Sequence, residues 1–172
     1  MAADRDPIHE AHGQWTRHGW DDAADGMAMV TSVVRVQQLL MERIDAVLRP
    51  LDLTFARYEV LRLLSFVQSG SMPMTRLGSL LQVHPTSVTS AVERLVRQGY
   101  VERLRREDDR RVILAALTDA GRDVVERATL GLNRDVFERP GIPTADVLRL
   151  TELLGELRSA AGDHVVAPAT SG

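Results

Sequence analysis

The chain has 172 residues, a formal net charge of −3 and no cysteine, and 44% of its residues are hydrophobic but only 4% aromatic. This composition is typical of a globular domain with one aliphatic core, and it excludes structural disulfides and any switch based on a thiol. No apolar run is long enough to span a bilayer and the N-terminus lacks a secretory pattern, so the sequence predicts a cytoplasmic protein.

The N-terminal segment, residues 1–25, is acidic, with two arginines against six acids and a local net charge of −4. It contains both tryptophans of the protein, Trp15 and Trp20. We expect part of this segment to dock on the body of the protein through these side chains, as a short helix. Three histidines lie in the same segment: His9, His12 and His18. No carboxylate or cysteine completes a zinc-ligand spacing with them, so we predict neither a metal site nor a cofactor.

Helical periodicity predicts three helices in the next part of the chain. An amphipathic pattern covers residues 27–48 and ends at Pro50. A second helix, of about residues 55–68, has Thr54 as a suitable N-cap, and a short third helix covers residues 74–81.

A fourth helix is predicted from Pro85 to Gln98. Proline suits the first helical position, and Gly99 suits the left-handed residue just past a helix end. Its apolar stripe consists of Val88, Ala91, Val92, Leu95 and Val96. The other side has short hydroxyl side chains and one arginine: Thr86, Ser87, Thr89, Ser90 and Arg94. Short hydroxyl side chains let a helix backbone approach base edges and phosphates, which suits a recognition helix. The helix alone fits the first turn of an ordinary surface helix equally well, and the segment that follows it favours the recognition helix.

A charged hairpin follows this helix. Residues 100–105 and 112–117 are strand-like runs on either side of the charged turn 106–111, and Met72-Pro73 is a candidate for a small third strand. Residues 94–111 contain seven arginines against four acids, a local net charge of +3, so that the rest of the chain has −6. Such segregation is expected when a basic surface meets phosphates.

Two more helices are predicted after the hairpin. Thr118 caps a helix of about residues 119–133, the segment 139–143 breaks it, and a last helix begins at Thr144. The apolar side of the last helix consists of Val147, Leu148, Leu150, Leu153, Leu154 and Leu157. The apolar faces of this helix and of residues 27–48 are larger than the predicted recognition helix and its hairpin could cover. We therefore expect a second copy of the chain to cover them in a two-fold homodimer. The alternative is a compact monomer in which these helices bury one another.

Three spaced motifs resemble elements of the MarR family of transcriptional regulators. They are Asp109-Arg110-Arg111, Leu117-Thr118-Asp119-Ala120-Gly121, and the spacing of Leu95, Gly99, Val101 and Arg103. The resemblance covers about residues 27–161. It implies a mainly α fold with a small β-wing, a winged helix–turn–helix flanked by N- and C-terminal dimerisation helices.

The resemblance also implies roles for the wing residues. Arg111 would enter the minor groove, Asp109 would hold it, and Arg110 would meet phosphate; Asp108 is an alternative to Asp109. With the recognition helix, the candidate DNA-binding residues are Pro85, Thr86, Ser87, Thr89, Ser90, Arg94, Asp109, Arg110 and Arg111. The partners would be operator DNA, a second copy of the chain, and a small-molecule effector bound where the dimer helices meet the winged domain. Candidate lining residues for that effector are Arg35, Arg57, Tyr58, Glu59 and His84, each of which suits a surface or capping position equally well, so the sequence assigns no ligand-binding residue.

These expectations divide the chain into five parts. They are an N-terminal extension (1–25), a dimerisation helix (26–53), a winged-helix DNA-binding domain (54–117), C-terminal dimerisation helices (118–162) and a flexible tail (163–172). No phosphate-binding glycine loop, catalytic triad or recognisable carboxylate pair is present in the sequence, so we predict a regulator and not an enzyme. The competing interpretation is a winged-helix module used for protein contacts, which would lack strongly salt-dependent DNA binding.

Overall fold

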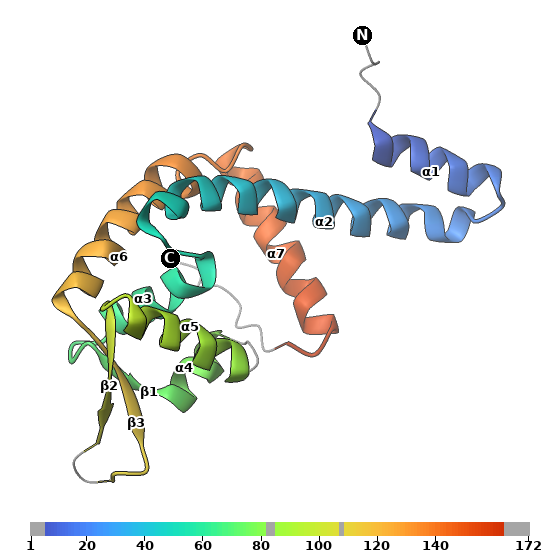
Figure 1. The fold of residues 1–172 in the computed structure, drawn as a ribbon. Coiled ribbons are helices and arrows are strands. Elements are labelled where there is room, and N and C mark those ends of the chain that lie inside the picture. The colour runs from blue at the N-terminus through green and yellow to red at the C-terminus, as the bar shows by residue number, and fades with distance from the viewer. Residues whose placement is uncertain (1–5, 82–84, 107–108, 164–172) are drawn as a thin grey trace, which may run out of the picture.

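A computed structural model describes residues 6–81, 85–106 and 109–163 (Figure 1). The helices are α1 (Pro7–Arg17), α2 (Asp21–Leu48), α3 (Phe55–Phe66), α4 (Met74–Leu81), α5 (Pro85–Arg97), α6 (Asp119–Leu132) and α7 (Thr144–Ala160), with a 3-10 turn η1 (Arg49–Leu51) and a π-helical turn η2 (Asn133–Phe137). The strands are β1 (Ser71–Pro73), β2 (Val101–Arg105) and β3 (Ile113–Leu117). Among the described residues, no helix is long and apolar enough to cross a membrane.

The centre of the molecule is a winged-helix body, formed by residues 53–117 with the end of α2 and with α6. Its antiparallel sheet has the order β1-β3-β2, with Val101 opposite Leu117 and Met72 opposite Ala115. The predicted hairpin and third strand are thus confirmed. The helices α3, α4 and α5 pack on this sheet, and α6 leads from it along α3 towards α2 (Figure 1).

The core of the body is aliphatic, as its composition predicts. Among the described residues every buried core side chain is apolar, and Tyr58 is the one aromatic residue among them. Ten large side chains are almost fully buried: Leu48, Val60, Leu61, Leu64, Leu77, Val92, Leu95, Val101, Val125 and Leu132. They come from α2, α3, α4, α5, β2 and α6, so one cluster joins these six elements.

The helix ends follow local capping rules. Thr54 Oγ1 accepts a hydrogen bond from the Arg57 N–H of α3 at 3.4 Å, and Thr118 Oγ1 accepts one from Gly121 of α6 at 3.0 Å. Gly99 has φ 75° just past α5, as predicted. Two predicted ends were wrong: α2 begins at Asp21 and not at Met27, and α3 ends at Phe66 and not at Gln68.

Gly121 shows why the Leu117–Gly121 motif needs a glycine. A Cβ there would lie 2.0 Å from the backbone oxygen of Tyr100 and 2.9 Å from Leu117 Cδ1. The close approach lets Thr118 bond two consecutive carbonyl groups of the turn between α5 and β2: its N–H donates to Tyr100 O at 3.1 Å and its hydroxyl donates to Gly99 O at 2.7 Å. The motif therefore joins the start of α6 to the turn between α5 and β2.

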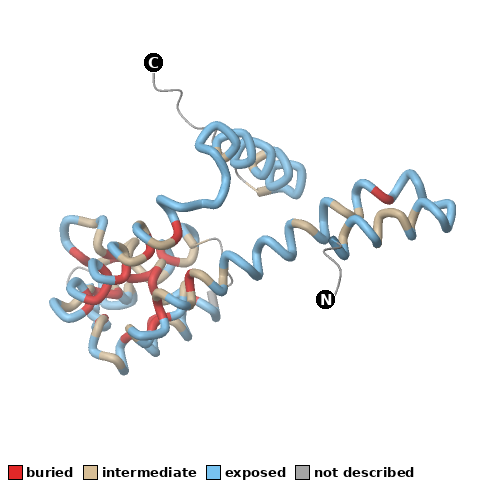
Figure 2. The backbone as a smooth tube through the Cα atoms, turned by 90° about the horizontal axis from the view of Figure 1, so that it is seen from above, coloured by how far each residue is buried: buried red, intermediate tan, exposed pale blue. Residues whose placement is uncertain are grey.

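Two helical arms extend from this body. The N-terminal arm consists of α1 and the first half of α2, which pack as an antiparallel hairpin and project away from the wing (Figure 1). The C-terminal arm is α7. In Figure 2 the buried positions gather in the body, whereas the N-terminal arm is a mixture of intermediate and exposed positions and α7 is almost wholly exposed; α1 and α7 have no buried residue, and the N-terminal half of α2 has only Ala24.

The expected docking of the two tryptophans on the body was wrong. α1 is a short helix, as predicted, but it packs on α2. Trp15 and Trp20 contact each other edge to face, with ring centroids 5.5 Å apart, and Trp20 is 53% exposed. They lie at the turn between α1 and α2, where His18 stacks on Trp20 with centroids 5.4 Å apart. The aromatic pair therefore closes the tip of the hairpin. Another contact across the hairpin is that of His12 Nε2 with Asp25 Oδ1, at 2.8 Å.

Candidate nucleic-acid interface

The helix α5 is fixed to the body by its apolar stripe. Val88, Val92 and Leu95 are buried in the core, at the spacing that places them on one side of a helix. The predicted groove-facing residues Thr86, Ser87, Thr89 and Ser90 and the predicted phosphate contact Arg94 are exposed. Pro85 begins the helix, but its side chain lies outside the described residues. The helix therefore presents a hydroxyl-rich surface on a rigid support.

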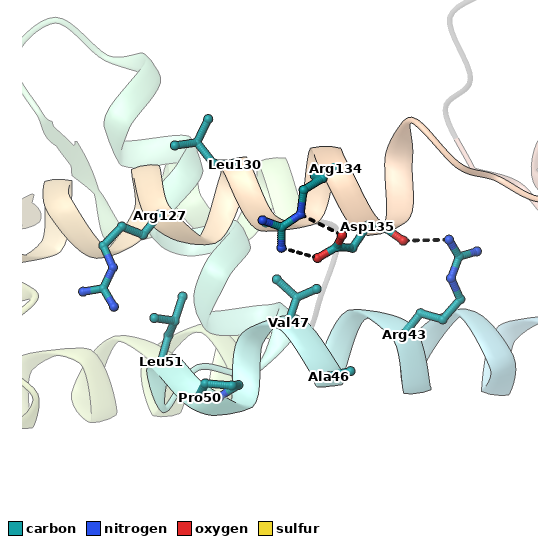
Figure 3. A pocket seen from close by; sticks show the side chains of 10 residues that line it. Arg43, Ala46, Val47, Pro50, Leu51, Arg127, Leu130, Arg134 and Asp135 are labelled. Carbon is teal, nitrogen blue, oxygen red and sulfur yellow. Dashed lines mark hydrogen bonds and ion pairs between the residues drawn. The ribbon is translucent and has the colours of Figure 1, made fainter.

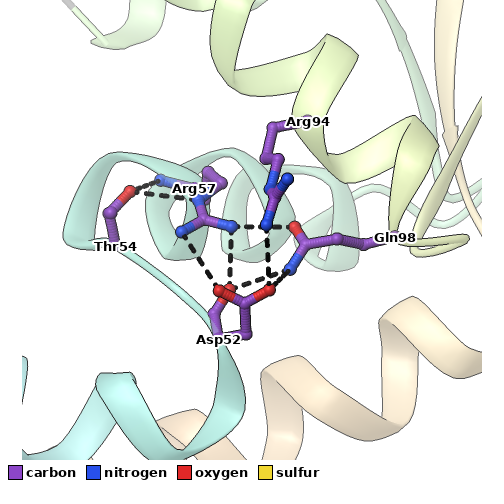
Figure 4. Close-up of polar contacts among 5 residues, drawn as sticks. All are labelled: Asp52, Thr54, Arg57, Arg94 and Gln98. Atoms are coloured by element: carbon purple, nitrogen blue, oxygen red, sulfur yellow. Dashed lines mark hydrogen bonds and ion pairs between the residues drawn. The ribbon is translucent and has the colours of Figure 1, made fainter.

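Asp52 holds a network of polar contacts behind this surface (Figure 4). It follows η1 and has φ 50°, the left-handed conformation. Its backbone oxygen accepts hydrogen bonds from Arg57 NH1 and Gln98 Nε2, both at 2.8 Å. Its carboxylate accepts from Gln98 Nε2 at 2.9 Å and from Arg94 NH2 at 3.3 Å. The residue after the α2–η1 segment is thereby tied to the recognition helix.

Arg57 completes this network from the first turn of α3. Its guanidinium donates to Gln98 Oε1 at 2.9 Å and to Thr54 Oγ1 at 3.3 Å, and the side chain is only 12% exposed. Its hydrogen-bonding capacity is therefore largely used inside the protein. Arg94, by contrast, has a side chain that is 50% exposed and, in the described part of the chain, a single carboxylate partner. Arg94 is thus the cation of the network that faces solvent.

A groove of about 600 Å³ runs between the start of α3 and the exposed side of α5. It is lined by Thr54, Ala56, Arg57, Thr86, Ser87, Ser90, Ala91, Arg94 and Arg97. Three of these nine residues are arginines and none is acidic. The predicted residues Thr86, Ser87, Ser90 and Arg94 are brought together here, whereas Thr89 does not line the groove.

The wing tip is shaped by Asp109. Its Oδ1 accepts a hydrogen bond from the Arg111 N–H at 3.0 Å, and its backbone oxygen accepts one from Val112 N at 3.0 Å. Asp109 thus contacts the backbone of Arg111 and not its guanidinium. The side chains of Arg110 and Arg111 are exposed to solvent at the end of the hairpin. Asp108, the alternative to Asp109, lies outside the described residues.

Sequence reasoning missed Asp52, Arg57 and Gln98 as parts of this site. Asp52 and Arg57 lie 46 and 41 residues before Gln98, so no local pattern relates them to it. The sequence contains only a weak indication of this network. Asp52 lies two residues before the Thr54 cap, and Gln98 directly follows the last residue of α5.

A second groove, of about 680 Å³, lies between the end of α2 and α6–η2 (Figure 3). Its apolar wall includes Val47, Pro50, Leu51 and Leu130, and its charged lining is Arg43, Arg127, Arg134 and Asp135. Arg43 NH2 donates to the backbone oxygens of Asp135 and Arg139 at 2.8 and 2.7 Å. The hydrogen bond from Arg134 lowers the pKa of the Asp135 carboxyl, which therefore stays charged at neutral pH.

The residues expected to line an effector cleft do not gather in one place. Arg57 lines the groove beside α5, Tyr58 is buried with its hydroxyl 3.2 Å from Thr129 Oγ1, and Arg35 contacts Gln38 on the exposed part of α2. Glu59 is partly buried, and that burial raises the pKa of its carboxyl. His84 lies outside the described residues.

Helix α4, helix α5 and a two-stranded wing define a winged helix–turn–helix protein, and comparisons with known proteins specify the family. The sequence model of the MarR family matches residues 53–113. The crystal structure of Sco5413, a MarR family transcriptional regulator from Streptomyces coelicolor, has a TM-score of 0.72 and 44% identity, covering 81% of this chain and 99% of that one. This chain therefore belongs to the MarR family of transcriptional regulators, whose members are not enzymes.

Two further relatives agree with this assignment. A cysteine-to-serine variant of MarR from E. coli, solved in complex with operator DNA, has a TM-score of 0.70 and 25% identity, covering 80% of this chain and 98% of that one. An uncharacterised HTH-type transcriptional regulator of Bacillus subtilis, YhbI, is 29% identical over 121 residues, which are 69% of this chain and 76% of the relative. The predicted family and fold class are thus confirmed.

Proposed function

We propose that this protein is a transcriptional repressor that binds a pseudo-palindromic operator as a homodimer and is released by a small molecule. The observation that carries the proposal is the exposed hydroxyl face of α5 beside exposed wing arginines, on a body whose fold is that of a MarR protein solved on operator DNA. Short hydroxyl side chains suit close approach in the major groove, and guanidinium groups suit phosphates and the narrow minor groove.

The proposed contacts divide into three kinds. Pro85, Thr86, Ser87, Thr89 and Ser90 form the part of α5 that enters the major groove. Arg94 and Arg110 neutralise phosphates, which supplies affinity without sequence selection. Arg111 enters the minor groove from the wing. Asp109 supports it by fixing the backbone from which its side chain starts, through the hydrogen bond at 3.0 Å.

The proposed dimer rests on the exposed apolar faces of the arms. Val30, Val33 and Val34 of α2 are 43% to 56% exposed, and Leu148, Leu150, Leu153 and Leu157 of α7 are 45% to 63% exposed. A surplus of apolar surface on helices at both ends of the chain favours a two-fold partner. We assign residues 26–53 and 118–162 to this interface and residues 54–117 to DNA binding. Such a dimer presents its two α5 helices to half-sites about 34–36 Å apart.

The proposed effector acts by changing this spacing. A ligand favours release only as far as it binds the DNA-incompetent spacing more tightly than the competent one. The groove between α2 and α6 offers apolar walls beside three arginines and one aspartate, Asp135, which is paired with Arg134, so its net positive charge suits an organic anion. Because this groove includes Pro50 and Leu51, its occupant would contact the segment that leads directly to Asp52.

A gel-shift titration tests the DNA-binding proposal. The purified protein is titrated on the DNA upstream of its own gene, at two salt concentrations and with random duplex as competitor. We expect specific binding that weakens by roughly 10³-fold or more from low to moderate salt. Binding to no duplex at either salt concentration would instead favour a module for protein contacts.

Arg111→Ala tests the wing assignment. We expect the variant to bind its operator about 1–3 kcal/mol more weakly while keeping its thermal stability, because the side chain is exposed. Arg17→Ala removes an exposed arginine from α1, far from the wing, and serves as the matched control. Unchanged operator affinity in Arg111→Ala would refute the wing assignment.

A further inference from the structure

The groove beside α5 has the chemistry of an anion site, and its exposed cations are limited to two. Arg57 lines it but is only 12% exposed and is bound to Asp52, Thr54 and Gln98. Arg94 is half exposed, and Arg97 is exposed and has no carboxylate partner among the described residues. Ser87 and Ser90 add hydroxyl donors from the same side of α5. Guanidinium and hydroxyl donors in a groove without an acid suit a phosphate oxygen.

Asp52 lies behind this groove and competes for one of its cations. The carboxylate does not line the groove, yet it accepts a hydrogen bond from Arg94 at 3.3 Å (Figure 4). The carboxylate is held beside Arg94 by Gln98 Nε2, which donates to it at 2.9 Å, and the Asp52 backbone oxygen is held by Arg57 and Gln98, both at 2.8 Å. A phosphate that enters the groove must therefore share Arg94 with a fixed carboxylate or take it over.

We infer that this groove receives a backbone phosphate of bound DNA, and that Asp52 limits DNA affinity by competing with this phosphate for Arg94. The inference rests on the proposed DNA-binding function and adds to it a residue that contacts no DNA. Asp52 acts in the free protein as an internal substitute for the phosphate. Its negative charge reduces the binding free energy that Arg94 gains from a phosphate, so the protein dissociates more readily from DNA.

Asp52→Asn removes the negative charge of the side chain while keeping its size and the local backbone conformation. Asparagine tolerates the left-handed backbone at this position, and both hydrogen bonds to the residue 52 backbone oxygen remain possible. An exposed ion pair of this kind changes an equilibrium by roughly 1.5- to 5-fold. Since a dimer has two such pairs, we expect the variant to bind its operator roughly 2- to 25-fold more tightly than the wild type.

Two controls separate competition from general electrostatics. Glu126→Gln removes the same charge from the ion pair with Arg62, which measures 2.8 Å and lines neither groove, so its operator affinity should stay close to wild type. Arg94→Gln alone should weaken binding, and Asp52→Asn should give no gain in that background, because the pair it relieves is absent. Asp52→Gly, which also accepts the left-handed backbone, replaces Asp52→Asn if thermal melting shows the latter to be unfolded.

The outcomes are distinct. Binding of Asp52→Asn that is no tighter than that of Glu126→Gln, or a gain that persists with Arg94→Gln, would overturn the inference while leaving the proposed function intact. Failure of the wild type to bind any duplex would overturn the proposed function itself. A free anion is the other source of a phosphate group. Thermal stabilisation of Asp52→Asn by inorganic phosphate, with no gain in DNA affinity, would assign the groove to that anion and refute the DNA contact.

Discussion

The winged-helix body and the two helical arms are built from similarly apolar helices, yet only the body buries them. Leu61, Leu64 and Leu95 of the body are fully buried, whereas Leu148 and Leu150 of α7 are 63% and 45% exposed. The difference lies in what surrounds each helix. The body's helices are closed over by a sheet and by one another, while the N-terminal arm is a two-helix hairpin that extends roughly 20 Å along the first half of α2.

One chain therefore supplies a complete support for the candidate DNA surface, whereas its arms keep apolar faces that the described part of the chain leaves exposed. The body needs no partner to hold α5 and the wing in place. The arms present leucines and valines that a second copy would cover. Substitutions that are severe in one region should therefore be mild in the other, and this contrast can be measured.

Gly121→Ala should have the largest effect. Its Cβ would lie 2.0 Å from the Tyr100 backbone oxygen, which has no flexible end that can move aside, so we expect a loss of more than about 4 kcal/mol in the free energy of unfolding. The same change in the arm, Gly26→Ala, meets nothing within 4 Å inside a helix and should stabilise by about 0.5–1 kcal/mol. Chemical denaturation of both variants checks the pair; a stable Gly121→Ala would contradict the observed packing.

Leu64→Ala should come next. Truncation of a fully buried leucine removes apolar contacts and leaves a cavity, so we expect a loss of about 2–5 kcal/mol. Leu148→Ala in α7, where the side chain is 63% exposed, should change the stability of the monomer by less than about 0.5 kcal/mol. Urea unfolding at protein concentrations below the dimer dissociation constant measures both free energies of unfolding. Equal losses in the two variants would contradict the proposed difference between body and arm.

Leu150→Glu tests whether the arms make the proposed dimer. A charge placed in an apolar interface without a partner should weaken association by about 2 kcal/mol or more, while the fold of the body is kept. Ser159→Glu adds the same charge at an exposed position nine residues further along α7, which lies on the side of the helix opposite Leu150, and serves as the control. Sedimentation equilibrium measures both. A dimer that is as tight in Leu150→Glu as in the control would exclude this face of α7 from the interface.

Glu59 should show the smallest effect. Burial raises the pKa of its carboxyl, so its ionised form is disfavoured in the folded state. The protonated side chain favours folding below the unfolded pKa, and this contribution is lost as the pH rises through the folded pKa. Glu59→Gln should therefore flatten the fall in stability across that window and slightly stabilise the protein at neutral pH. Melting temperatures from pH 4 to pH 7 check the sign, and a steeper fall in the variant would contradict it.

The sequence by itself determined the local structure and the surface most suited to DNA. The Thr54 and Thr118 caps, Gly99 past α5 and the hairpin all follow rules that act over a few residues, which is why they were predictable. The hydroxyl face of α5 and the arginines of the wing could likewise be predicted from the sequence. The family motifs added the order of the elements, and the fold class was confirmed.

Tertiary structure decided how distant segments meet. The sequence did not indicate that α1 packs on α2 and not on the body, or that Gly121 touches the Tyr100 backbone. Nor did it link Asp52 to Arg94 and Gln98, which lie 42 and 46 residues further along the chain. These contacts depend on how the helices pack around the shared core, and that packing is a property of all the segments together. A pattern of a few residues specifies a helix and its apolar and polar faces, but it does not specify which other segment packs against each face.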